Sequence, residues 1–161
     1  MKRLLRATAL VLCVCLPISS LAAAARQAPD FRLPGVKSEV KLSAYRGKVV
    51  YIDFWASWCG PCRKSFPWMN ELQEKYGSRV KIIAINLDQE RAEADKFLEQ
   101  NSPKFTVVFD PAGKTAESYR VKAMPSSYLI DSNGRIVSSH AGFRSRDKEE
   151  LEKMIEQIIK K

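Results

Sequence analysis

Apolar and polar positions along this chain repeat with two periods, one typical of β-strands and one typical of amphipathic helices. Runs rich in β-branched and aromatic residues predict strands at 48–55, 80–87, 105–109, 126–130 and 135–140. Apolar residues spaced by three or four positions predict helices at 62–76, 89–100, 114–119 and 147–159. Strands that alternate with helices and end in a hairpin favour an α/β fold, with a central mixed β-sheet flanked by helices on both faces.

Some of these segments carry further local detail. The strand at 48–55 has apolar side chains on both faces, as a buried central strand requires. Pro67 lies inside the first helix and should kink it. Asp147 and Glu150 have the spacing of a capping box at the start of the last helix. Residues 26–38 are predicted to form a linker before the first strand.

The N-terminus has the order of residues found in a bacterial signal peptide. A basic start precedes a mainly apolar segment at 7–16, and small residues then offer a cleavage site after Ala24 or Ala25. We therefore expect a signal peptide at 1–25 and one domain at 26–161. The apolar segment is short for a membrane span, which needs about 20 apolar residues, and a retained N-terminal anchor is the alternative.

Length and charge narrow the classes of protein further. With 161 residues, 45% of them hydrophobic, the chain can bury one sizeable core. The net charge is +9, and without the leader 24 basic and 18 acidic residues leave +6. The basic residues are interleaved with acids and form no stripe with aromatic residues between them. A solvated surface is therefore expected, and no nucleic-acid partner.

The four cysteines fall into two pairs. Cys13 and Cys15 lie in the apolar part of the leader, where cysteine behaves as a small hydrophobic residue. After cleavage only Cys59 and Cys62 remain, and they are too close in sequence to staple a fold. An exported chain with a single pair of this spacing is predicted to carry a working dithiol rather than a structural framework of disulfides.

The pair lies in Cys59-Gly60-Pro61-Cys62, at the junction of a predicted buried strand and a helix. The unpaired N–H groups and the dipole of the helix N-terminus favour a thiolate at Cys59, which makes it the attacking sulfur. Cys62, one turn further on, should be shielded and should resolve the mixed disulfide. The redox-active disulfide itself needs no cofactor. A structural disulfide or half of a zinc site is the alternative, but His140 is the only histidine available to complete the latter.

At this point the sequence resembles the thioredoxin superfamily, and more closely its exported TlpA/ResA-like branch. The resemblance covers roughly residues 28–161 and rests most on residues 50–64, Phe66-Pro67 and Met124-Pro125. It implies a thioredoxin fold with an N-terminal extension and a central βα insertion, which we place at 80–100.

The resemblance also implies a substrate-binding surface. Pro125 matches the cis-proline that lies beside the active cysteines, and Met124 would present its backbone to the substrate. Trp58 is expected on the rim, together with Gly60 and Pro61, the residues between the cysteines that tune the redox potential. All five are therefore predicted to contact substrates.

A third catalytic residue, Asp53, is implied at the position of the buried acid of thioredoxins. That acid helps to move the proton of the resolving cysteine, and burial should raise its pKa. A strand aspartate with a purely structural role is the alternative. Many TlpA/ResA-like proteins carry another residue at this position, and ResA-like proteins often carry a glutamate where this chain has Ser65. The second departure weakens a narrow assignment to apocytochrome c reduction in cytochrome c biogenesis.

The resemblance implies an exported thiol–disulfide oxidoreductase that reduces disulfides in periplasmic proteins and is recharged by a transmembrane thiol conduit of the DsbD/CcdA type. We expect a monomer. A net oxidant or isomerase is a second enzymatic interpretation. A copper chaperone for oxidase assembly is the alternative from another class, since paired thiolates bind Cu(I) well. His140 is expected to be structural or exposed.

The leader gives the first testable prediction. Mass spectrometry of the exported protein should show a chain that starts at Ala25 or Arg26, because signal peptidase cuts after small residues that follow an apolar segment. Recovery of the intact chain with Met1 in the membrane fraction would instead establish a retained anchor.

Overall fold

The computed structural model describes residues 26–160, so the expected leader lies outside the described residues. A five-stranded sheet forms the centre, with the strand order β5-β4-β3-β6-β7. The first three strands in this order are parallel, and β6 and β7 are antiparallel to their neighbours, which confirms a mixed sheet. The strands are β3 (Val49–Trp55), β4 (Val80–Asn86), β5 (Thr106–Phe109), β6 (Ser126–Ile130) and β7 (Ile136–Ala141).

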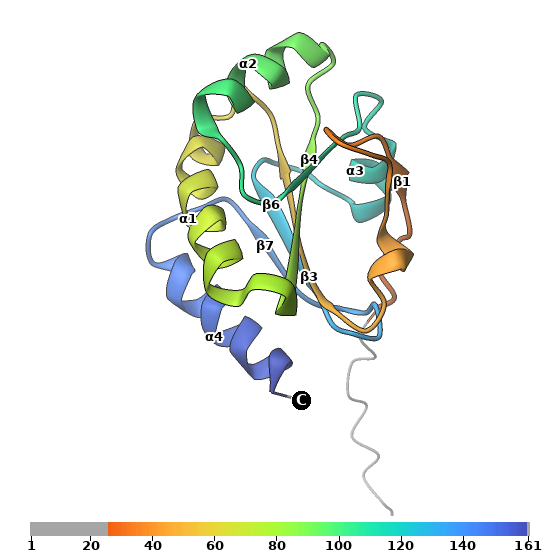
Figure 1. Ribbon diagram of the computed structural model, residues 1–161, viewed down its shortest axis with the longest axis vertical. Helices are drawn as coiled ribbons and strands as arrows, with labels where there is room; N and C mark the ends of the chain where they lie inside the picture. The colour runs from red at the N-terminus through yellow and green to blue at the C-terminus, as the bar shows by residue number, and fades with distance from the viewer. Residues whose placement is uncertain (1–25, 161) are drawn as a thin grey trace, which may run out of the picture.

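Helices cover both faces of this sheet (Figure 1). They are α1 (Gly60–Tyr76), α2 (Arg91–Asn101), α3 (Lys114–Tyr119) and α4 (Asp147–Ile159). Two 3-10 turns, η1 (Leu42–Tyr45) and η2 (Gly77–Arg79), precede β3 and β4. No helix among residues 26–160 is both long enough and apolar enough to cross a bilayer. The arrangement is that of a thioredoxin fold.

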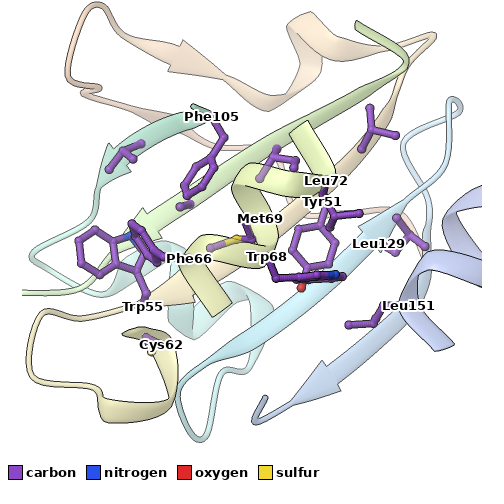
Figure 2. Packing of buried hydrophobic residues seen from close by; sticks show 14 of the residues in the cluster. Tyr51, Trp55, Cys62, Phe66, Trp68, Met69, Leu72, Phe105, Leu129 and Leu151 are labelled. Atoms are coloured by element: carbon purple, nitrogen blue, oxygen red, sulfur yellow. The ribbon is translucent and has the colours of Figure 1, made fainter. Parts of the chain in front are cut away.

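Two layers of core form because successive side chains of a strand point to opposite faces. From β3, Tyr51 and Trp55 point into the layer under α1, α2 and α4, whereas Ile52 and Phe54 point into the layer under α3. The first layer is rich in aromatic rings, among them Phe66 of α1, which lies beside Trp55 (Figure 2). The Phe66 ring centroid lies 4.8–5.3 Å from those of three others, Trp55, Phe97 and Phe105. This packing fixes α1 against the sheet.

The segment before β3 is an N-terminal extension of the sheet. It contains a short antiparallel pair, β1 (Arg32–Leu33) and β2 (Val40–Lys41). Its backbone also reaches both edges of the main sheet, since Ile136 N–H donates to Arg26 and Val36 N–H donates to Val107. Gly35 is required at the second edge, where a Cβ would lie 2.5 Å from a backbone oxygen. The extension thereby protects edge strands that would otherwise be open to pairing.

The structure differs from the sequence at the start of the last helix. The predicted capping box is wrong, because α4 has no side-chain cap. The Asp147 carboxylate instead accepts hydrogen bonds from the backbone and side chain of Arg144. Pro67 does lie inside α1, and the helix continues through it as one element to Tyr76. The segment 80–100 supplies β4 and α2, with β4 lying between β3 and β5.

Candidate active site

Cys59 and Cys62 form a disulfide at the N-terminus of α1, just beyond the end of β3. Their Cα atoms are 5.3 Å apart. Cys59 is the N-cap of the helix, and its Sγ accepts a hydrogen bond from the Cys62 N–H at 3.3 Å. A sulfur in this position receives one of the helix's otherwise unpaired N–H groups and faces the positive end of its dipole. The same geometry stabilises a thiolate once the disulfide is reduced.

The two cysteines differ in access. Cys59 retains 4% exposure, whereas Cys62 has none. Around them Trp58 is 71% exposed, and Gly60 and Pro61 are also at the surface. A side chain at Gly60 would meet nothing within 4 Å, so the glycine keeps the approach to the disulfide open. A partner protein can therefore reach Cys59 and cannot reach Cys62.

A buried carboxylate holds the turn that delivers Cys59 to this position. Asp88 follows β4 and accepts hydrogen bonds from the Ser57 N–H at 2.9 Å and from the Ser57 hydroxyl at 3.1 Å. It also accepts a bond of 2.7 Å from the Asn86 side chain. Sequence reasoning missed this network, since 31 residues separate Asp88 from Ser57. The one available indication was two polar residues, Asn86 and Asp88, at the end of an otherwise apolar strand.

Asp53 lies in the middle of β3 with 2% exposure. The alternation of β3 places its side chain on the same face as Tyr51 and Trp55, which is the face covered by α1 and therefore by Cys62. Its Oδ2 has no hydrogen-bond partner among the described residues, and the nearby Trp55 Nε1 also has none. Burial raises the pKa of the Asp53 carboxyl well above its ordinary value. A carboxylate with a raised pKa is a stronger base than an ordinary aspartate, which suits it to accept a proton.

The residues predicted to contact substrate lie on two elements. The Met124–Pro125 peptide is cis, as the resemblance implies. Pro125 is buried at the start of β6, and its carbonyl accepts a hydrogen bond of 2.7 Å from the Gly142 N–H. Met124 is half-buried and packs against the core layer that contains both cysteines. The structure thus brings the segment before β6 to the same layer as the disulfide.

Two other polar residues have structural positions. Ser65 is fully buried and its hydroxyl donates to the Cys62 carbonyl at 2.9 Å. His140 lies on β7, 3.0 Å from the Asp147 carboxylate, where it joins the end of the sheet to α4. Within residues 26–160, no three His, Cys, Asp or Glu side chains are grouped closely enough to hold a metal ion.

Comparison with known proteins agrees with this geometry. The chain matches the Redoxin family over residues 23–155. The thiol-disulfide oxidoreductase ResA of Bacillus thuringiensis is 35% identical over 135 residues, 83% of this chain and 77% of its own. ResA of Geobacillus kaustophilus is 38% identical over 133 residues, 81% of this chain and 75% of its own.

Solved structures show the same relationship. A Chlorobium tepidum protein, provisionally identified as the thiol:disulfide interchange protein DsbE, is 54% identical with a TM-score of 0.82. The match covers 84% of this chain and 96% of that protein. The exposed lipoprotein thioredoxin Etrx1 of Streptococcus pneumoniae is 32% identical with a TM-score of 0.72, covering 80% of this chain and 99% of its own.

The raised pKa of Asp53 gives a prediction for stability. Between the unfolded-state pKa of about 3.9 and the higher folded-state pKa, the folded protein holds a proton that the unfolded chain has lost. The free energy of unfolding should therefore fall as pH rises through this window. Asp53→Asn should not show this fall in the free energy of unfolding. It should be more stable than the wild type by about 1–3 kcal/mol at pH 8, with a smaller difference at pH 4.

Denaturant melts across this pH range measure the effect. Asp88→Asn is the matched comparison, because Asp88 is equally buried but fully hydrogen-bonded, and its replacement should destabilise the protein. A pH-independent difference between wild type and Asp53→Asn would contradict the raised pKa.

Proposed function

The chain belongs to the Redoxin family and is a thiol–disulfide oxidoreductase, and from this premise we propose that it reduces disulfides of exported proteins in the periplasm. The observation that carries the proposal is the N-cap position of Cys59: its Sγ accepts a hydrogen bond from the Cys62 N–H, and the residue, unlike Cys62, retains some exposure. Attack on a disulfide requires a thiolate that a partner can reach, and this position supplies both conditions.

The first step of the proposed cycle starts from the reduced dithiol. The Cys59 thiolate attacks one sulfur of the substrate disulfide, and a new bond forms between Cys59 and that sulfur as the substrate's own S–S bond breaks. The departing substrate sulfur leaves as a thiolate and takes a proton from water. The intermediate is a mixed disulfide at the rim formed by Trp58, Gly60 and Pro61.

The second step releases the substrate. Cys62 loses its proton and attacks the Cys59 sulfur, so that the Cys59–Cys62 disulfide forms and the second substrate sulfur leaves and is protonated. Two electrons have then passed from the dithiol to the substrate. Cys62 has no exposure to water, so its proton needs an acceptor inside the protein. We assign that role to Asp53, which is unpartnered at Oδ2 and lies on the face of β3 that α1 covers.

The direction of the cycle depends on what reduces the disulfide afterwards. We propose a transmembrane thiol conduit of the DsbD/CcdA type, which would reach the same sulfur, Cys59, by the same exchange chemistry. The backbone of Met124, before the cis peptide bond, would hold first the substrate protein and then the conduit beside the disulfide. The relatives named thiol-disulfide oxidoreductase ResA agree with this exchange chemistry.

Separate replacement of the cysteines tests the cycle. Cys59→Ser should abolish reduction of a disulfide-bonded protein such as insulin, because the accessible nucleophile is lost. Cys62→Ser should still attack and should accumulate mixed disulfides with exported proteins, because the resolving thiol is missing. Non-reducing gels and mass spectrometry detect these species. Mixed disulfides with Cys59→Ser in place of Cys62→Ser would reverse the two roles.

The role of Asp53 is tested by the rate of resolution. General-base assistance is worth about 10²–10⁴-fold, so Asp53→Asn should slow release from a preformed mixed disulfide at pH 7 by roughly this factor. The loss should shrink as rising pH ionises Cys62 without assistance. Single-turnover measurements across pH check this, with the attack step as internal control. Wild-type release rates at pH 7 would leave Asp53 with a structural role alone.

A further inference from the structure

A second concave site lies at the end of the sheet opposite the disulfide. The parallel strands end near Cys59, and this groove, of about 740 Å³, lies where the same strands begin. Its walls come from the N-terminal extension, the start of β4, the turn after α1 and the segment before β5. A volume of this size is typical of sites for small organic ligands. Nothing in the thiol chemistry uses it.

The groove is lined by four lysines and by no acidic residue. Lys37 and Lys48 come from the N-terminal extension, Lys81 from the start of β4 and Lys104 from the segment before β5. Lys104 is paired with Glu74 outside the groove. For the other three, no carboxylate among the described residues lies within 4.0 Å. The described part of the folded chain therefore gathers three lysines at this groove without a carboxylate partner for any of them.

Lys81 is the least expected member of this set. It lies within β4 and is half-buried, with its ammonium donating to the Thr106 hydroxyl and lying 5.1 Å from the centre of the Tyr45 ring. Burial and the neighbouring charge of Lys48 both lower the pKa of Lys81. A half-buried ammonium next to a like charge is unfavourable unless an anion joins it. Together with Lys37 and Lys48, which line the same groove and also lack a carboxylate partner within residues 26–160, Lys81 favours an anionic ligand here.

Besides the lysines, the lining combines polar residues, Ser38, Gln73, Ser78 and Thr106, with a group of apolar side chains. Val40, Val80, Phe105 and Val107 are buried and form the floor, and Val36 at the margin is 56% exposed, which is unusual for a large apolar residue. Lysine heads above an apolar floor match a ligand with an anionic group at one end and a hydrocarbon part at the other. Lysine is a common phosphate binder, acting as a point charge.

We propose that this groove binds a phosphate-bearing amphiphile, with the phosphate between Lys48 and Lys81 and the hydrocarbon part on the apolar floor. An anionic phospholipid headgroup with the beginning of its acyl chains has this chemistry. A lipid bound here would leave the disulfide, at the other end, open to protein partners.

The test uses the full chain, oxidised, and follows backbone amide shifts by NMR. The probes are monomeric short-chain phosphatidylglycerol, phosphatidylcholine of the same chain length, and inorganic phosphate. Phosphatidylglycerol should shift the amides of Val36, Lys81 and Thr106 in a saturable way. Lys48→Gln should weaken this binding about tenfold, and Lys153→Gln, an exposed lysine on α4, should leave it unchanged.

Each probe has a defined meaning. Tighter binding of phosphatidylglycerol than of inorganic phosphate assigns the site to the lipid, and equal binding of the two assigns it to the free anion, with the shared phosphate chemistry supported in both cases. Three results would overturn the proposal: no shift at the groove with phosphatidylglycerol or inorganic phosphate, binding of phosphatidylcholine as tight as that of phosphatidylglycerol, or equal affinity in Lys48→Gln and wild type. Insulin reduction by Lys48→Gln should equal that of the wild type, so failure here is distinguishable from failure of the thiol cycle.

Discussion

The seven residues of β3 are all buried, because α1, α2 and α4 cover one face of the sheet while α3 and the N-terminal extension cover the other. A strand buried on both faces leaves no solvent-exposed position for a polar side chain. Asp53 must then lie inside the core, and alternation places it on the α1 face. The same burial anchors the end of the strand, so the turn that follows delivers Cys59 to the first position of α1. Packing of β3 thus determines the geometry of the disulfide.

Two buried aspartates near this turn, Asp88 and Asp53, differ in their hydrogen bonding. Asp88 accepts hydrogen bonds from the backbone and hydroxyl of Ser57 and from Asn86, so its charge is compensated and its role is to hold a loop. Asp53 has an unpartnered oxygen and a raised pKa, so its charge is costly and its proton is exchangeable. No hydrogen bond to Oδ2 among the described residues offsets the free-energy cost of burying the Asp53 carboxyl. This contrast is the physical reason to assign proton transfer to Asp53 and positioning to Asp88.

The sequence predicted the parts of this structure that depend on local pattern. Apolar periodicity located each strand of the main sheet to within one or two residues, and the spacing of Cys59 and Cys62 indicated a redox pair on a helix N-terminus. What it missed depends on contacts between distant segments. The Asp88 network joins two loops that meet only after β3 and β4 pair, and the lysine groove gathers side chains from four segments. The capping box at Asp147 failed because Arg144 competed for the carboxylate.

Complete burial of Cys62 also constrains how the proposed cycle can be organised. A partner can exchange only with Cys59, so the protein to be reduced and the donor that recharges the dithiol must reach the same sulfur in turn. They cannot be bound there together, and the surface around Trp58 has to accept both. The rim of Trp58, Gly60 and Pro61 offers one large exposed ring for apolar contact and has few side chains that a partner's surface must match. Such a rim suits partners of different shape.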